Sequence, residues 1–267
     1  MNQIKHFPIS YLGNKSKDYK HFSDLLPNDK LIIVEPFGGS FAVSRLKYYD
    51  DKYKKHINDL SQPLYKLYDA FKNDSEKINK LFDDIKIFID NEFIKYNING
   101  VKNTFVKPQD FWEYMNNYDY NDEIKEIIKE NVMVRGMLNK RPNLKYDDFF
   151  NFCKTIDFTN SDYKIILDQY EHNKDAFLFI DPPYLDSHNT AYQNMKDKRC
   201  KDKYIIDNTE MFVVLSEYIK KCECKIMIIL NNNAIIRHLF KDYIKQIYKK
   251  NYDISNSKTE HLIICNY

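Results

Sequence analysis

The chain has 267 residues, of which 43% are hydrophobic and 15% aromatic. This length and composition fit one large globular domain, or a core with a smaller insertion, and they exclude a disordered chain. The formal net charge of +2 is too small to indicate a nucleic-acid partner by itself, so any such evidence must come from the distribution of charge.

The first informative group is Tyr11-Leu12-Gly13-Asn14-Lys15, followed by an expected helix up to Leu26. Gly13 allows a tight turn, Lys15 supplies a cation and Tyr11 an amphipathic ring. A plain turn before a helix explains the same residues equally well.

An apolar run at residues 31–34 leads into Glu35-Pro36-Phe37-Gly38-Gly39-Ser40 and then into a segment with helical spacing up to residue 49. A strand, a glycine-rich turn and a helix open many nucleotide-binding α/β folds. The motif lacks the glycine spacing and the Lys-Ser/Thr pair of pyrophosphate sites, so it favours a ligand without a pyrophosphate. A turn required only by packing is the alternative.

Residues 56–58 form an expected second strand that ends in Asp59, about twenty residues after the glycines. Nucleotide-binding α/β folds place a ribose-binding carboxylate at this position. Asp59 can equally belong to the N-terminal cap of the helix that is expected to begin near Ser61, and both roles are compatible.

Residues 63–148 form a predicted helix-rich insertion, because apolar residues recur there at helical spacing. Near its end lies a loop, residues 135–143, with no acidic residue. Arg, Lys and Asn side chains reach phosphates and base edges, so we favour a DNA contact here over a bare surface loop. The loop residues in question are Arg135, Asn139, Lys140 and Arg141.

The sheet is expected to resume at residues 153–158, followed by a polar turn that includes Asp162 and a helix to residue 170. A further buried strand is predicted at 176–180. Beyond it lie a long polar loop at 186–204 and a helix from residue 209. The buried strand at 225–230 ends in three asparagines, and another helix and a terminal strand at 261–267 complete the fold.

The strand at 176–180 runs directly into Asp181-Pro182-Pro183-Tyr184. A carboxylate at the carboxyl end of a strand lies where open α/β sheets bind ligands. The two prolines lack N–H groups, so the turn keeps carbonyl acceptors but loses donors, and Tyr184 adds a flat ring. This combination suits a planar ligand with N–H donors, such as a nucleobase with an exocyclic amine; an ordinary strand-ending turn is the alternative.

The five cysteines are scattered, and none forms a pair of metal-binding motifs. We therefore expect reduced thiols, no structural metal and a cytoplasmic location. No apolar signal core and no run of about 18 apolar residues is present, so a soluble protein is expected.

The order of the three motifs, with a long insertion before the last, resembles that of the Dam-type adenine-N6 DNA methyltransferases of the alpha group, the D12 class. The resemblance implies an α/β fold with a Rossmann-like seven-stranded mixed sheet. It also implies a catalytic, S-adenosylmethionine-binding domain at residues 1–62 and 149–267, and a target-recognition domain at 63–148.

The implied reaction moves a methyl group from S-adenosylmethionine to N6 of an adenine flipped out of double-stranded DNA. The matching catalytic residues are Asp181, Pro182, Pro183 and Tyr184. The matching cofactor residues are Tyr11, Lys15, Glu35, Pro36, Phe37, Gly38, Gly39, Ser40, Asp59 and Asp162, with Asp157 as a rival to Asp162.

Residues 135–143 depart from the family's base-reading hairpin, so the resemblance implies no target sequence. An RNA adenine-N6 methyltransferase and a non-catalytic DNA-binding relative are the alternative functions. The sequence does not separate restriction-modification from a mobile-element or regulatory role, and it predicts no oligomeric state.

Overall fold

The computed structural model describes residues 3–9, 11, 14–98, 108–134, 137–138, 147–183, 208–251 and 258–267. The chain divides into two compact units. Unit 1 comprises Met1–Tyr19 and Gly38–Tyr163, and unit 2 comprises Lys20–Phe37 and Lys164–Tyr267. No helix among the residues described combines the length and hydrophobicity needed to span a bilayer.

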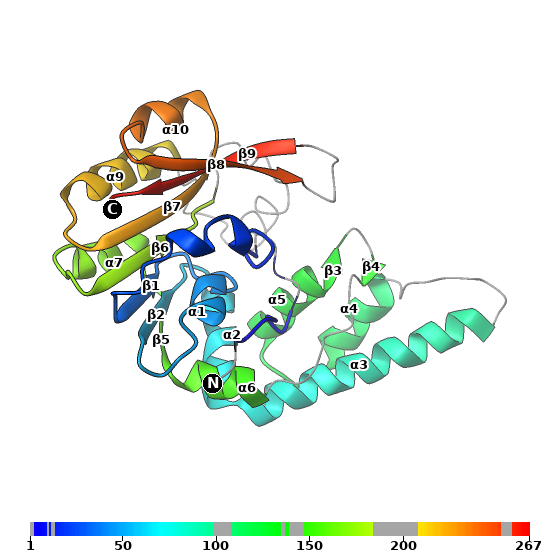
Figure 1. The fold of residues 1–267 in the computed structure, drawn as a ribbon. Helices are drawn as coiled ribbons and strands as arrows, with labels where there is room; N and C mark the ends of the chain where they lie inside the picture. Colours follow the sequence, from blue (N-terminus) through cyan, green and yellow to red (C-terminus); the bar gives the residue numbers. More distant parts are fainter. Residues whose placement is uncertain are drawn as a thin grey trace. The chain divides into compact units, whose positions relative to one another are not determined.

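Seven strands form one mixed sheet in the order β5-β2-β1-β6-β7-β9-β8, which confirms the predicted fold class (Figure 1). The pairs β2–β5, β1–β6 and β6–β7 are parallel, whereas β9 is antiparallel to both β7 and β8. The strands are β1 (Ile32–Glu35), β2 (Lys54–Asn58), β5 (Ile156–Thr159), β6 (Ala176–Ile180), β7 (Lys225–Asn231), β8 (Ile244–Asn251) and β9 (Lys258–Cys265).

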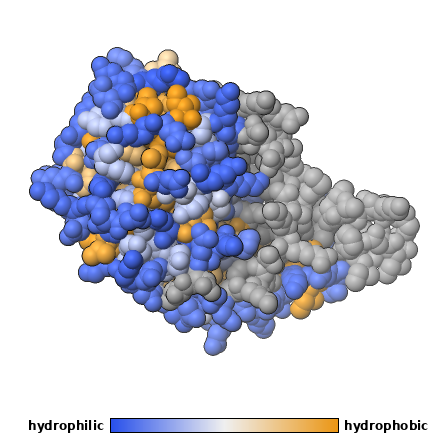
Figure 2. Space-filling view, in the orientation of Figure 1, coloured by the Kyte–Doolittle hydropathy of each residue, from blue (hydrophilic) through white to orange (hydrophobic). Residues whose placement is uncertain are grey.

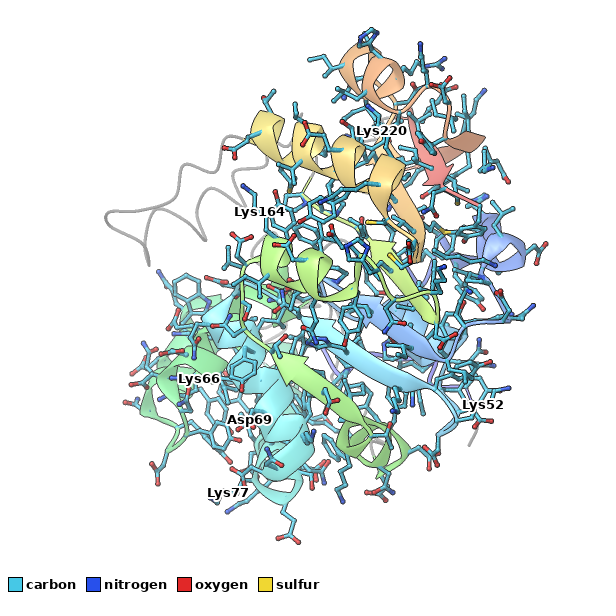
Figure 3. The ribbon with its side chains drawn as sticks, turned by 90° about the vertical axis from the view of Figure 1, so that its left-hand side faces the viewer. Lys52, Lys66, Asp69, Lys77, Lys164 and Lys220 are labelled. Carbon is cyan, nitrogen blue, oxygen red and sulfur yellow. The ribbon has the colours of Figure 1, made fainter. Side chains whose placement is uncertain are left out.

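Unit 2 is built on β1, β6 and β7, whose central residues are buried because both faces of parallel strands are covered. Its helices are α7 (Tyr163–Tyr170), α9 (Asn208–Lys221) and α10 (Ala234–Leu239). Lys164 donates to Glu210 of α9 at 3.0 Å and so ties α7 to α9 (Figure 3). The Asn266 side chain bonds the backbone of Ile226 and Cys224, which fixes the start of β7.

Unit 1 combines β2, β5 and the short helix α1 (Ala42–Leu46) with five longer helices. These are α2 (Gln62–Asn73), α3 (Ser75–Ile98), α4 (Pro108–Asn117), α5 (Asp122–Val132) and α6 (Asp147–Lys154), and a short hairpin joins β3 (Met133–Val134) to β4 (Met137–Leu138). One apolar cluster runs through this unit from Phe41 and Ile57 to Leu67, Phe82 and Ile128. The proposed boundaries of the insertion at residues 63 and 148 remain a prediction.

Large apolar side chains gather in this cluster and in the sheet, while the surface is mainly polar. On the face seen in Figure 2 the described residues are mostly hydrophilic, with small separate hydrophobic patches. Scattered exposed apolar residues such as Ile165 are normal for a folded domain.

Two expected elements were wrong in type or extent, and one strand was not expected. Residues 16–26 do not form one helix but turns with two 3₁₀ segments, Tyr19–His21 and Ser23–Leu25. The Asn14 side chain accepts the Ser16 N–H at 2.9 Å, a local bond that competes with helix formation.

The expected strand at 153–158 begins later, because residues 147–154 form helix α6 with Phe149, Phe152 and Cys153 buried. Burial at this spacing is typical of one helix face. Strand β8 was missed altogether, since its lysines hide the alternation that marks a strand.

The buried Arg45 side chain holds the N-terminal segment of unit 1 against the glycine turn. Its Nε donates to the Ser40 carbonyl at 2.8 Å, and its two terminal nitrogens donate to the Ile4 carbonyl and to Ser16 Oγ at 2.9 and 3.1 Å. The residue is fully buried, and its bonds to Ser40 and Ile4 are buried as well, so these two carbonyls depend on it for a partner that water cannot replace.

We expect Arg45→Met to lower the free energy of unfolding by about 3 kcal/mol, because it leaves two buried carbonyls and the half-buried Ser16 Oγ without this donor. Urea denaturation followed by circular dichroism measures the change. The control is Arg237→Met on the exposed helix α10, expected to change stability by less than about 1 kcal/mol. Equal midpoints for the two variants would contradict this role of Arg45.

Candidate active site

In unit 2, three polar positions meet at the carboxyl ends of β1, β6 and β7. Val34 pairs with Leu178 and Ile180 pairs with Ile228, so the three parallel strands end on the same side of the sheet. We call this side the carboxyl end of the sheet. It carries Glu35, Asp181 and Asn231. This is where open α/β sheets bind ligands.

The turn after β6 exposes acceptors and offers few donors. Asp181 is half-buried, Pro182 is buried and Pro183 is exposed. The Asp181 carboxylate and the Pro182 carbonyl are hydrogen-bond acceptors. Neither proline adds a backbone donor, because proline has no N–H. Glu35 beside it is only 2% exposed. The carboxyl end therefore suits a ligand that brings its own N–H groups.

In unit 1, the glycine turn is fixed by hydrogen bonds on both of its glycines. Gly38 N donates to the Asn58 carbonyl at 2.6 Å, and Gly39 N donates to Asp59 Oδ2 at 3.0 Å. Tyr68 Oη donates to the Gly39 carbonyl at 2.6 Å. The turn is thus held in one conformation before any ligand arrives.

Neither glycine has room for a side chain. A Cβ on Gly38 would lie 2.6 Å from Ile57 Cγ2, and Gly39 has a φ of +50°. A Cβ on Gly39 would also lie 3.1 Å from the ring of Tyr11, so the turn and the N-terminal motif lie side by side within unit 1. The adjacent Lys15 is 4% exposed.

The Asp59 carboxylate is oriented by two backbone donors, Gly39 N to Oδ2 and Ser61 N to Oδ1, at 3.0 and 2.9 Å. The Ser61 bond agrees with the predicted role near the start of α2. Burial raises the pKa of Asp59, although the two hydrogen bonds oppose the rise. A carboxylate keeps lone pairs beyond these two bonds, so Asp59 can also accept from ligand hydroxyls.

A polar network ties the loop that carries Asp162 to the end of β2. Asn58 Oδ1 accepts from Ser161 N and Thr159 Oγ1, and its Nδ2 donates to the Ser161 carbonyl, each at 2.9 Å. Asn160 Nδ2 donates to the Asp59 carbonyl at 2.7 Å. Asp162 follows β5 directly after this network. Its rival Asp157 lies within β5, opposite His56.

Asn231 is a candidate that the sequence did not single out. Its Oδ1 is buried at the carboxyl end of the sheet and has no hydrogen-bond partner among the residues described. Buried polar atoms are nearly always bonded, so an orphan acceptor in such a place indicates a missing donor. The sequence did carry a signal that could have identified Asn231. Like Asp181, it is a polar residue at the end of a buried apolar strand.

The remaining predicted site residues are distributed as follows. Pro36 and Phe37 lie in unit 2 beside Glu35, and Ser40 lies in unit 1 with its carbonyl bound by Arg45. Tyr184, Arg135, Asn139, Lys140 and Arg141 lie outside the described residues, so their roles stay predictions.

Comparison with known proteins agrees with this geometry. The sequence profile of the D12 class N6 adenine-specific DNA methyltransferase family matches residues 11–255. The type II methyltransferase M.CviBI of Paramecium bursaria Chlorella virus NC1A is 26% identical over 283 aligned positions, which cover 97% of this chain and 98% of the relative. The strand order, with one antiparallel strand inserted near the end, is typical of class I methyltransferases.

The raised pKa of Asp59 predicts a pH-dependent stability. Above the ordinary value of 3.8, the folded protein binds more protons at Asp59 than the unfolded chain does. The free energy of unfolding of the wild type, relative to Asp59→Asn, should therefore fall as pH rises from about 4 through the raised pKa and then level off. Urea midpoints at a series of pH values measure it.

Asp50→Asn is a control of opposite sign, because the Lys52 N–H lowers the pKa of Asp50. The wild type should lose stability relative to this variant as the pH falls through and below 3.8. A flat difference between the wild type and Asp59→Asn would rule out a raised pKa at Asp59.

Proposed function

The chain belongs to the D12 class of N6 adenine-specific DNA methyltransferases, and we propose that it methylates an adenine flipped out of double-stranded DNA with S-adenosylmethionine as cofactor. The observation that supports this proposal is the Asp181-Pro182-Pro183 turn, which the strand register puts at the same end of the sheet as Glu35 and Asn231.

The residues present fit the proposed cofactor. Gly38 and Gly39 fix the path of the turn, because a Cβ on Gly38 would lie 2.6 Å from Ile57 Cγ2 and a Cβ on Gly39 would lie 3.1 Å from the Tyr11 ring. Asp59 has acceptor capacity for ribose hydroxyls, and Glu35 can pair with the ammonium of a methionine moiety. Asp162 is our choice over Asp157 for the cofactor's adenine, because it follows the end of β5 rather than lying within the strand. When bound, S-adenosylmethionine supplies an electrophilic methyl group.

Asp181 and Pro182 make the adenine amine reactive. The N6 lone pair is delocalised into the ring, so N6 is a poor nucleophile while it stays planar. The Asp181 carboxylate and the Pro182 carbonyl accept one N6–H bond each, which favours the tetrahedral amine and aims its lone pair. The contribution of the protein is orientation and electrostatic placement.

Access to this turn requires the adenine to leave the duplex, at a cost of a few kcal/mol of unpairing and unstacking. We assign Tyr184 to stacking on the extruded base. Residues 63–148 act as the target-recognition domain, and the cations of the 135–143 loop contact DNA. In this proposal the catalytic domain comprises residues 1–62 and 149–267.

We expect Asp181→Ala to reduce methyl transfer by about 10³-fold, because one of the two acceptors for the N6 amine is lost. Incorporation of labelled methyl groups into duplex DNA measures the rate, and a parallel assay on RNA tests the substrate class. Cofactor affinity, measured by calorimetry, should change little. The control is Asp168→Ala on the exposed face of α7. An Asp181→Ala enzyme as active as this control would overturn the assignment.

Asn231 gives a second test, because we propose that its buried Oδ1 accepts an N–H group of the bound substrate or cofactor. Asn231→Leu should keep or raise thermal stability, since it removes an unsatisfied buried acceptor, yet slow methyl transfer about tenfold.

The matched control is Asn232→Leu, whose amide donates to Glu260 at 2.7 Å and accepts from Arg237 at 2.5 Å. Because these bonds are already made in the ligand-free protein, this variant should lose stability. A loss of stability in Asn231→Leu with unchanged activity would assign Asn231 a purely structural role.

A further inference from the structure

The outer strand β8 carries positive charge that the proposed reaction does not use. It lies at the end of the sheet order, next to β9. Between residues 237 and 250 the chain has five Lys or Arg residues and one acid, Asp242. Lys241, Lys245 and Lys249 are exposed.

The direction of β8 places the lysines at its C-terminal end on the same side of the sheet as the candidate site. β9 is antiparallel to both β7 and β8, so β8 runs parallel to β7. Lys249 and Lys250 therefore lie at the carboxyl end of the sheet, the side that carries Asp181. Lys241 and Lys245 lie at the opposite end of the strand, where Ile244 pairs with Ile264.

The β8–β9 pair also reaches beyond β7. Asn231, the last residue of β7, pairs with His261, which in turn pairs with Tyr248. Three more pairs follow, Lys249 with Glu260, Lys250 with Thr259 and Asn251 with Lys258; Figure 1 shows the two strands β8 and β9 that carry them. At about 3.3 Å per residue they extend roughly 10 Å past the end of β7. We call residues 249–251 and 258–260 the distal hairpin segment.

Packed aromatic and imidazole rings support the pair Tyr248–His261, from which the distal hairpin segment extends. His21 stacks on Tyr248 with ring centroids 4.6 Å apart, and Tyr248 lies 5.3 Å from the ring of His261. Tyr248 and His261 are buried, at 4% and 0% exposed. Charges on the distal hairpin segment are thus carried on a fixed support rather than on a free loop.

The segment contains three lysines and one acid, Glu260, whose carboxylate accepts the Asn232 amide at 2.7 Å. Lysines on outer strands also prevent edge-to-edge aggregation. Protection against aggregation would require lysines at both ends of β8. Only the lysines at the distal end can contact a ligand bound at Asp181. The two ends can therefore be compared directly.

We propose that the distal hairpin segment binds the phosphate backbone of the DNA whose adenine is held at Asp181; this inference rests on the proposed function. Three strand spacings of about 4.8 Å place β8 roughly 14 Å from β6. This is comparable to the ~12 Å width of the major groove, so a duplex that delivers a base to Asp181 has phosphates within reach. Such contacts set affinity and orientation and carry no sequence information.

The test compares two double variants with the same charge change, Lys249→Gln with Lys250→Gln at the distal end and Lys241→Gln with Lys245→Gln at the other. Fluorescence anisotropy gives the Kd for a duplex of arbitrary sequence over a range of salt concentrations. The distal variant should show a slope of log K against log salt that is shallower by about 1.8, because two phosphate contacts are lost. The other variant should match the wild type.

Methylation of plasmid DNA gives a second measurement. The distal variant should raise the KM for DNA on the order of tenfold, with kcat and cofactor affinity unchanged. Equal salt slopes for the wild type and the distal variant would overturn the proposal, as would the same shift in both variants. Self-association of the distal variant with an unchanged slope would assign the lysines to edge protection alone.

The binding slope does not depend on turnover, so it is informative even for an inactive enzyme. A wild-type protein that methylates no DNA would instead refute the proposed function. The two failures are therefore distinguishable.

Discussion

Close packing at Gly38 is the constraint on which the part of the candidate site in unit 1 depends. The backbone of this residue lies so near Ile57 and the Asn58 carbonyl that no Cβ fits. This approach lets Gly38 N reach the Asn58 carbonyl, and the next residue then meets Asp59 Oδ2 and Tyr68 Oη. One contact between a turn and the end of β2 thus sets the path of the turn and the direction of a carboxylate.

The candidate residues divide between two structural environments with different chemistry. Unit 1 holds the N-terminal motif, the glycines, Asp59 and Asp162, which are groups suited to binding a nucleoside. Unit 2 holds Glu35, Asp181 and Asn231, which are acceptors at the end of parallel strands. The Glu35–Ser40 motif begins in unit 2 and ends in unit 1.

Short sequence patterns predicted those strands and turns that are determined by neighbouring residues in the chain. The run before Asp181 and the double proline marked β6 and its end, and the glycines marked the turn after β1. The sequence did not predict features that depend on distant partners. The acceptors of Arg45 include Ile4, 41 residues away, and β8 is a strand because β9 pairs with it. The orphan oxygen of Asn231 is likewise visible only once its neighbours are in place.

Three unfavourable features lie at or next to candidate-site residues, whereas two of the side chains that support those residues are hydrogen-bonded. Phe41, directly after the glycine turn, has a φ of +37°, a left-handed conformation that costs roughly 1–2 kcal/mol outside glycine. Asp59 has a raised pKa, and Asn231 has a buried acceptor that no donor of the described residues reaches. By contrast, Arg45 and Asn58 each make three side-chain hydrogen bonds to their surroundings.

A sequence selected for stability alone could have removed the strain at Phe41 with a glycine and the unbonded acceptor at Asn231 with an apolar residue. Their persistence is explained if ligands complete what the free protein leaves unsatisfied. Ribose hydroxyls would stabilise the Asp59 carboxylate, and an N–H donor would bond Asn231. The rigid, satisfied supports then hold these groups in place before binding, so little ordering is left to oppose it.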